Sequence, residues 1–298
     1  MTVEPTVADV SVTGTAGRGR EGASANHSSH PGLIRLTGSR TAIELKQFFR
    51  QPESAVFTFA LPLLLLLLFG SIFSGAIEGP PGAKAITFRQ YFLAGMVASG
   101  VMSACFNNLA ISISIEKSEG MLKLLGLTPL PPAAYFGGKL LSCLVISIIE
   151  AVLMLIVGLA MFGLSLPVDV THWVVFGGVF VIGVVTCVLL GIAYTRLIPN
   201  SRAAAPMVMP IYLILQFISG VFFQFTQIPT ALRWVADVFP LRWMALGLRY
   251  AFLPDWFKSQ ETGQQWNLPV VFTVLAAWLV VGSVLAARTF KWGRIPND

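Results

Sequence analysis

Charged residues are scarce in this chain of 298 residues: Asp, Glu, Lys and Arg together make up 11% of it. A typical soluble domain contains about 25% of them. Hydrophobic residues make up 55% of the chain, and its mean hydropathy is +0.75. A soluble fold of this size cannot bury so much apolar surface. The composition therefore excludes a soluble globular protein and indicates a chain that resides in a lipid bilayer.

Metal-binding and disulfide-forming residues are also few. The three cysteines lie inside apolar runs with no CxxC pair, and the three histidines are scattered. Structural zinc sites need Cys and His at short, regular spacings, so we expect neither a metal site nor a disulfide framework. The patterns G-x-S-x-G and H-E-x-x-H are missing as well. With no nucleophile–base pair in sight, we predict no catalytic residues.

Six apolar segments are long enough, at about 20 residues, to cross a hydrocarbon core of roughly 30 Å. Runs of this length are too long for the alternating strands of about 10 residues that build outer-membrane barrels. The sequence therefore predicts an all-α integral membrane protein with six transmembrane helices. The predicted spans are Ala55–Ile77, Tyr91–Ile115, Leu140–Leu166, Trp173–Tyr194, Ala203–Gln224 and Leu268–Ala287.

Two different segments precede the first span. Residues 1–32 are rich in Ser, Thr, Gly and Ala and predict a disordered tail. Residues 33–54 instead carry apolar residues at helical spacing beside charged ones, which predicts a short amphipathic helix in the membrane interface. The sequence from Thr41 to Glu44 fits a capping box and would mark the start of this helix. The alternative is a solvated linker that happens to be periodic.

The distribution of Lys and Arg predicts the orientation. Six precede the first span, and 14 in all fall on the side of the two termini, against 6 on the other side. Because positively charged loops stay in the cytoplasm, both termini are expected to be cytoplasmic.

The long segment 225–267 is expected outside the cell. Within it, Ala231–Phe239 and Leu241–Phe252 are amphipathic pieces separated by Pro240, and the second is too short to span a membrane. A pair of short helices that dip into the outer leaflet fits this pattern. The alternative is an external loop packed on its own protein. Four aromatic residues here suit a membrane–water interface: Trp234, Trp243, Tyr250 and Trp256.

The loop between the second and third spans is the most informative stretch. It predicts a short helix over residues 116–127, with an acidic start, an apolar face, and Gly126 and Pro129 to end it. An apolar helix displayed in the cytoplasm is suited to being held by a partner, whereas the plainer interpretation is a tight turn in the interface. Farther on, Gly137-Gly138-Lys139 lacks the Walker pattern, since Leu140 stands where Ser or Thr would be needed, so this chain is not expected to bind ATP there.

Three stretches together resemble one known family. The pattern E-x-x-x-G-x-L-x-x-L-x-x-T-P-L over residues 116–130, followed by Gly138-Lys139-Leu140, resembles the signature of type-2 ABC exporter permeases. The opening stretch around residues 50–73, with R-Q-P-E and L-F-G, is similar to the daunorubicin- and multidrug-resistance branch. The stretch around 219–240, with S-G-V-F-F and L-R-W, resembles the family's segment after span 5. The resemblance covers about residues 35–290.

The resemblance implies a permease domain over residues 55–290, in which each short helix has a family role. The helix of 33–54 would be the elbow helix, that of about 116–127 the coupling helix, and the region of about 225–267 would hold re-entrant helices. Two permeases would pair, as a homodimer or a heterodimer, in a bacterial plasma membrane among membrane lipids. A separate ABC ATPase subunit, carrying ATP and Mg²⁺, would dock on each coupling helix. Neither a cofactor on this chain nor nucleic acid as a partner is expected.

Two sets of candidate site residues follow from this resemblance. One set would couple the chain to the ATPase without doing chemistry: Glu116, Glu119, Gly120, Leu124 and Leu125. Gly120 in particular would allow another backbone to approach closely, or it is simply a glycine at a helix start. The other set lies in or near the substrate pathway, since the resembled family lines its dimer interface with spans 2 and 5: Asn107, Asn108, Glu150 and Gln216.

The residues of the second set have a structural interpretation too. A charge in mid-membrane costs roughly 2.5–3.5 kcal/mol on insertion scales, so Glu150 should face protein or water or be protonated. It would either meet a cationic drug or be a hydrogen-bonded structural residue. The amides would equally serve as interhelical hydrogen bonds.

The expected function is therefore that of the permease subunit of an ATP-driven exporter of an amphipathic drug, natural product or lipid. The alternatives are a polysaccharide or glycolipid exporter of the same family, and a secondary transporter without an ATPase. A secondary transporter would call for inverted repeats or several intramembrane charges, which this sequence does not display.

Overall fold

The computed structural model describes residues 32–73, 75–82, 85–128, 130–164, 166–167 and 169–289. The tail predicted to be disordered lies outside this part of the chain except for Gly32, and so does Pro129, which was expected to end the short helix. Six helical segments within the described residues are long and apolar enough to cross a membrane, which confirms the predicted fold class. These segments are Pro52–Ile72, Phe88–Ser118, Pro132–Phe162, Val170–Tyr194, Ser201–Ile218 and Leu268–Arg288.

The spans correspond to α2 (Pro52–Ile72), the continuous rod of α3 (Phe88–Met102), η1 (Ser103–Asn108) and α4 (Leu109–Ser118), and then α6 (Pro132–Phe162), α7 (Val170–Tyr194), α8 (Ser201–Ile218) and α11 (Leu268–Thr289). The short elements are α1 (Leu33–Arg50), α5 (Met121–Gly126), η2 (Phe225–Gln227), α9 (Thr230–Val238), α10 (Pro240–Phe252), η3 (Asp255–Gln260) and η4 (Thr262–Gln264). A two-stranded antiparallel hairpin joins spans 1 and 2, with Ala76 of β1 (Ala76–Ile77) paired to Thr87 of β2 (Ile86–Thr87).

The second span forms the centre of the bundle. Of its most apolar stretch, 78% is buried inside the protein, against 17% for the last span. The helices α2, α6, α7 and α10 all pack on α3. Consequently α3 has buried residues on all its sides, whereas α2 and α11 leave most of their apolar surface for lipid or a partner.

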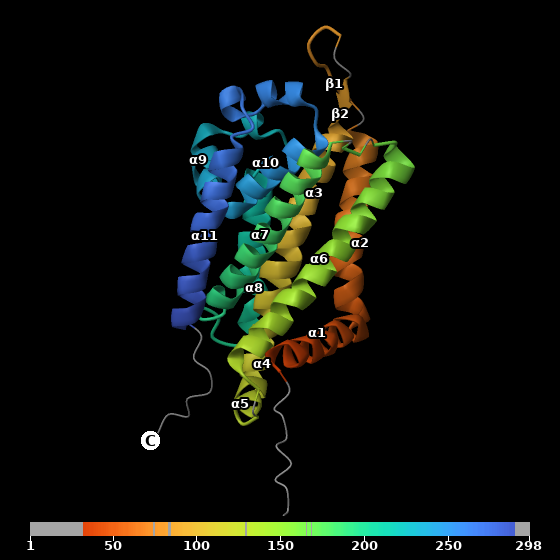
Figure 1. Ribbon diagram of the computed structural model, residues 1–298. Coiled ribbons are helices and arrows are strands. Elements are labelled where there is room, and N and C mark those ends of the chain that lie inside the picture. The colour runs from red at the N-terminus through yellow and green to blue at the C-terminus, as the bar shows by residue number, and fades with distance from the viewer. Residues whose placement is uncertain are drawn as a thin grey trace, which may run out of the picture. The chain divides into compact units, whose positions relative to one another are not determined.

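The short helices gather at opposite ends of the spans (Figure 1). At one end, α1 lies across the bundle and α5 hangs below α4; this is called the α5 end. At the other end are α9, α10 and the hairpin; this is called the α10 end. The predicted pair of short helices around Pro240 is present, but α10 is buried against α3, α7 and α11. Gly247 makes this possible, because a side chain there would meet Val179 of α7 at 2.7 Å. Of the two interpretations of the segment, packing on its own protein is what α10 shows, while α9 leaves Trp234 exposed. Insertion of the two helices into the outer leaflet stays a prediction.

The capping box predicted at Thr41 was wrong. The helix α1 begins at Leu33, and the Thr41 hydroxyl donates to the Thr37 carbonyl at 2.9 Å, inside the helix. Tertiary packing extends α1 beyond its local signal, since Thr37 and Arg40 lie directly on two glycines of α6. A Cβ at Gly138 would come within 2.5 Å of Arg40, and one at Gly137 within 2.9 Å of Thr37. The two glycines that faintly resembled a phosphate loop therefore make room for α1.

The helix predicted over residues 116–127 is also interrupted. The helix α4 continues the second span to Ser118, and α5 starts only at Met121. Between them Gly120 has φ +76° and ψ +4°, a left-handed conformation that costs other residues about 1 kcal/mol or more. Gly120 thus turns the chain, and no atom lies within 4 Å of where its Cβ would be.

Candidate functional site

The helix α5 presents an apolar surface to the outside of the protein. Leu124 is 62% exposed and Leu127 is 78% exposed, and Met121 is exposed as well. Leu125 is half-buried, and Glu119 in the preceding turn is exposed. In Figure 1, α5 lies beyond α1, farther from the spans than the amphipathic helix expected at the membrane surface. Four of the five predicted coupling residues therefore lie on or beside a protruding apolar helix.

Glu116, the fifth predicted coupling residue, is placed differently. Its side chain turns inward and joins Arg40 and Glu44 of α1 and Lys139 of α6, in what is here called the inner ion cluster (Arg40, Glu44, Glu116, Lys139). The Lys139 ammonium donates to Glu44 at 2.7 Å and also to Glu116. Arg40 pairs with Glu44 on the same helix face. All four side chains are at least 85% buried.

The inner ion cluster ties three elements together next to α5. Two positive and two negative charges balance, and the Tyr135 hydroxyl adds a hydrogen bond to Glu116 at 2.7 Å. Because α4 runs directly into the turn that carries α5, the cluster links the base of α5 to α1 and α6. Sequence reasoning missed Arg40, Glu44 and Lys139. The available signal was a lysine directly beside the predicted third span, where an unpaired charge is unfavourable.

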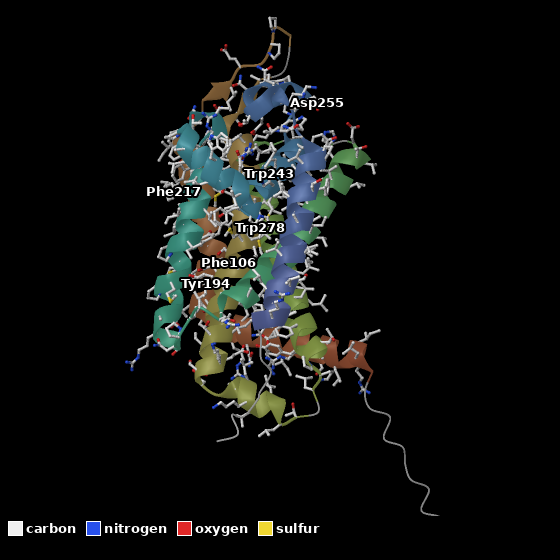
Figure 2. The ribbon with its side chains drawn as sticks, turned by 90° about the vertical axis from the view of Figure 1, so that its left-hand side faces the viewer. Phe106, Tyr194, Phe217, Trp243, Asp255 and Trp278 are labelled. Carbon is white, nitrogen blue, oxygen red and sulfur yellow. The ribbon has the colours of Figure 1, made fainter. Side chains whose placement is uncertain are left out.

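The predicted pathway residues Asn107 and Asn108 lie in η1, a π-helical turn inside the second span. Such turns are rare and occur frequently at functional sites. The Asn108 amide donates to Thr58 of α2 at 3.0 Å, while the buried Asn107 amide oxygen has no hydrogen-bond partner. Within this turn, the ring of Phe106 packs on that of Tyr194 of α7 with 5.6 Å between the ring centroids; both residues are labelled in Figure 2.

The predicted residues Glu150 and Gln216 approach one place on α3 from two other helices. Gln216 of α8 donates to Ser99, whose hydroxyl lies 3.0 Å from that of Tyr212. The Glu150 carboxylate of α6 lies against Gly100, the next residue of α3. The structure therefore brings Glu150 and Gln216 to neighbouring residues, whereas the two asparagines lie about two turns farther along the span.

A second group of buried charges lies at the α10 end and was not predicted. This outer ion cluster consists of Arg242 and Arg249 of α10, Glu261 after η3, and Asp237 of α9. Arg249 donates to Glu261 at 2.7 Å and Arg242 does so at 3.3 Å, while Asp237 lies 3.7 Å from Arg242. Arg249 also donates to the carbonyl of Gly220, just after α8.

Electrostatics at the outer ion cluster favour the charged form of Glu261. Burial alone would raise the pKa of Glu261, but the guanidinium groups of Arg249 and Arg242 outweigh it and hold that pKa below its usual range. The ring of Tyr91 lies under Arg249 at 4.3 Å, and its hydroxyl is 3.0 Å from the Gly220 carbonyl. The cluster therefore joins α10 to α3, to the end of α8 and to the segment before α11.

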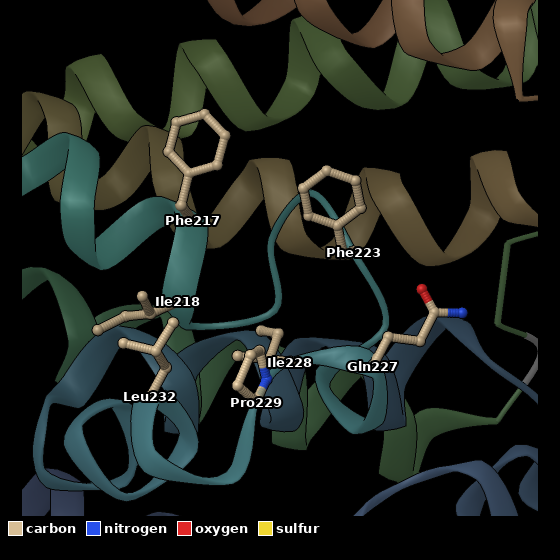
Figure 3. A pocket seen from close by; sticks show the side chains of 7 residues that line it. All are labelled: Phe217, Ile218, Phe223, Gln227, Ile228, Pro229 and Leu232. Atoms are coloured by element: carbon tan, nitrogen blue, oxygen red, sulfur yellow. The ribbon is translucent and has the colours of Figure 1, made fainter.

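An apolar cavity of about 310 Å³ opens beside this region, between the end of α8 and α9 (Figure 3). The rings of Phe217 and Phe223 and the side chain of Leu232 form its walls.

Two indoles fix the end of α9 nearby: Trp243 donates to the carbonyl of Asp237 at 2.7 Å, and Trp278 to that of Val238 at 2.6 Å. Both indoles and Phe217 are labelled in Figure 2. Trp243 is thus hydrogen-bonded within the protein.

Comparison with known proteins identifies the family to which this arrangement belongs. The model of the ABC-2 type transporter family matches residues 37–253, which span α1 to the end of α10. The chain belongs to the ABC-2 type transporter family. It is 23% identical over 220 residues to the inner membrane transport permease YadH of Escherichia coli K12, and the aligned region covers 71% of this chain and 82% of YadH. It is also 22% identical over 258 residues to ycf38 of Porphyra purpurea, provisionally named a transport permease, covering 81% of this chain and 86% of ycf38.

The family membership and the six apolar helices together make this chain the multi-pass transmembrane permease subunit of a transporter. Members of the ABC-2 family act in general with an ABC ATPase. Within the described residues, no three His, Cys, Asp or Glu side chains come together as a metal-binding group.

Proposed function

We propose that this permease exports an amphipathic compound, a drug, natural product or lipid, driven by ATP that a separate ATPase chain hydrolyses with Mg²⁺. The observation that carries the proposal is the protruding α5 with its exposed leucines, in a chain whose family model covers that helix. An exposed apolar helix beyond the membrane surface is unfavourable in water unless a protein covers it. The ATPase subunit is that protein.

In this proposal the residues around α5 transmit force and do no chemistry. Leu124 and Leu125 fill a cleft on the ATPase, Glu119 lies at its rim, and Gly120 provides the turn that aims α5 outward. Glu116 acts one step behind them, since its partners Lys139 and Glu44 carry the displacement to α6 and α1. Closure of two ATPase subunits on ATP would then move the ends of these helices as a unit.

The remaining parts of the proposal concern the assembly and the substrate. Two permeases pair, as identical or different chains, and the substrate passes between them near Asn107, Asn108, Glu150 and Gln216. The name of the Escherichia coli relative supports an inner-membrane location. The resemblance to the drug-resistance branch favours an amphipathic compound over a polysaccharide or glycolipid. A secondary transporter without an ATPase would leave α5 uncovered.

Truncating the apolar face of α5 tests the proposal. We expect the amount of ATPase that co-purifies with the double variant Leu124→Ala/Leu125→Ala to fall by a factor of about ten or more. The reason is that each fully covered leucine contributes about 1.5–3 kcal/mol to the free energy of binding. The permease itself should stay abundant, since Leu124 is largely exposed in the isolated chain. The measurement is quantitative pull-down of the ATPase from membranes that contain both chains.

The control for this experiment is Leu130→Ala, which removes a leucine after the end of α5. It should retain most of the ATPase. If the double variant binds the ATPase and transports as the unaltered chain does, α5 is not the docking helix and the proposal fails at its main observation.

The orientation of the chain gives a second prediction. With the native cysteines replaced, Thr262→Cys should react with a membrane-impermeant thiol reagent in intact cells, whereas Arg20→Cys and Lys123→Cys should be protected until the membrane is permeabilised. The reason is the excess of Lys and Arg on the side of the termini. Labelling of positions 20 and 123 from outside would reverse the topology.

A further inference from the structure

Glu150 stands apart from every other ionisable residue of the membrane spans. Among the described residues, the other Asp, Glu, Lys and Arg side chains of the six spans lie within about two turns of an end of the span. Glu150, by contrast, is near the middle of α6. Its side chain is 2% exposed. Neither carboxylate oxygen has a hydrogen-bond partner. A buried carboxyl group without a partner is unfavourable, so an intramembrane one indicates a function.

The carboxylate lies in a notch that Gly100 creates. A Cβ at position 100 would come within 2.5 Å of one Glu150 oxygen and 3.0 Å of the other. Three residues farther along, the second span changes from α-helix to the π-helical turn η1. Helices shift their register or bend readily at such turns. The notch therefore lies beside the segment of the second span that is best able to move away from α6.

The polar groups near Glu150 already serve one another. The Ser99 hydroxyl accepts from Gln216 and lies 3.0 Å from the Tyr212 hydroxyl. Glu150 interacts electrostatically with the Tyr212 phenol but is not hydrogen-bonded to it. The rest of this stretch of α3 is apolar, with Met96, Val97 and Val101. No Lys or Arg in the described part of the chain forms an ion pair with Glu150, so its carboxyl group is available as the single counter-charge of an approaching cation.

This set of groups fits a lipophilic organic monocation. A metal ion such as Ca²⁺ or Mg²⁺ takes six or more oxygen ligands, and one carboxylate with engaged hydroxyls does not supply them. An organic cation needs one counter-charge, apolar walls and an aromatic ring such as that of Tyr212, over whose face a cation is attracted.

We propose that Glu150 is the counter-charge for the cationic group of the exported compound, which enters beside Gly100 when the second span moves away from α6. This inference rests on the proposed function and narrows its substrate to amphipathic monocations. In the closed arrangement seen here, the carboxyl group fills the notch itself. When the notch opens, the cation replaces the missing partner of the carboxylate.

The test measures binding to the purified full-length permease in lipid nanodiscs, with tetraphenylphosphonium as the cation and triphenylphosphine oxide as a neutral aromatic probe. Glu150→Gln keeps the side chain's shape and removes its charge. We expect it to bind tetraphenylphosphonium about ten-fold more weakly, since an opposed charge is lost in a medium of low dielectric constant. Binding of the neutral probe should be unchanged.

Three variants separate a specific site from general effects. Glu150→Asp keeps the charge and should restore most of the affinity. Gly100→Ala puts a methyl group where the carboxylate lies and should weaken binding of the cation. Glu53→Gln removes an exposed carboxylate at the start of α2 and should bind both probes as the unaltered chain does.

Each contrary outcome has a distinct meaning. Equal affinity of Glu150→Gln and the unaltered chain for tetraphenylphosphonium would overturn the inference. The absence of tetraphenylphosphonium binding to the unaltered chain would overturn it as well. Loss of transport in Glu150→Gln without loss of binding would also overturn it, because Glu150 would then be a proton carrier or a structural residue. Because no ATPase is present in this assay, its failure leaves the α5 pull-down unaffected, and the two proposals fail separately.

Discussion

Replacing Lys139 with methionine should lower the free energy of unfolding of the permease by about 3 to 5 kcal/mol, the cost of breaking a buried ion pair. Methionine keeps much of the side-chain volume, so the loss reports on charge. Without Lys139, Glu44 still has Arg40, but Glu116 keeps only two hydroxyl donors, those of Tyr135 and Ser112, and a guanidinium at 4.0 Å. A buried carboxylate is then left largely uncompensated. The measurement is unfolding of the purified chain in detergent.

Two further variants make this prediction specific. Lys117→Met removes an exposed lysine of α4 and should change stability by less than about 0.5 kcal/mol. The double variant Lys139→Met/Glu116→Gln should recover part of the loss, because it leaves the neutral pair of Arg40 and Glu44. If Lys139→Met is as stable as Lys117→Met, the inner ion cluster does not hold α1, α4 and α6 together.

Replacing Glu261 with glutamine should destabilise the α10 end by a similar amount, about 3 to 5 kcal/mol. Of the two buried guanidinium groups, that of Arg242 would then keep the partly exposed Asp237 as its counter-charge, at 3.7 Å. Arg249 would keep its hydrogen bond to the Gly220 carbonyl but lose its counter-charge. Unfolding of Glu261→Gln should be compared with that of Glu78→Gln, an exposed glutamate near the hairpin, which should remain close to the unaltered chain.

The effect of Glu261→Gln should depend on pH. The pKa of Glu261 in the folded protein is held below its usual range, chiefly by Arg249 and Arg242 against the opposing effect of burial. A carboxyl group of this kind stabilises the fold above its unfolded pKa of about 4.3 and ceases to do so as pH falls through the lower folded pKa. The stability difference between the two chains should therefore be full at pH 7 and shrink below about pH 4. A difference that stays constant with pH would mean that the charge of Glu261 is not what stabilises this end.

Each ion cluster lies at one end of the bundle and joins helices there. The inner cluster joins the middle of α1 to the end of α4 and the first turns of α6, and the outer cluster joins α10 to α3 and to the end of α8. Between them, the apolar helices contact one another through small residues and few hydrogen bonds. Buried ion pairs therefore hold α4 and α6 at the α5 end and α10 at the α10 end, whereas Glu150 in the middle of α6 has no hydrogen-bond partner.

The sequence by itself determined the architecture of this protein. Hydropathy and segment length predicted six membrane spans, and the structure confirms them with ends shifted by up to eight residues. The proline at 240 correctly divided α9 from α10. These features are local, because about 20 consecutive apolar residues have no stable alternative in a bilayer to a helix with its backbone hydrogen bonds satisfied internally. The resemblance of the loop at 116–130 likewise led to the family that the comparisons show.

The tertiary structure alone decided how the polar residues are used. It placed Thr41 inside α1 instead of at a capping box, because Thr37 and Arg40 of this helix pack on Gly137 and Gly138 of α6. It turned Glu116 inward to Lys139 and left Glu150 without a partner. Each of these outcomes depends on residues that are far apart in the chain, such as Lys139 and Glu44, 95 positions away. Local hydropathy carries no information about such pairs, because the free energy of a buried charge depends on which opposite charge the packed helices bring within reach.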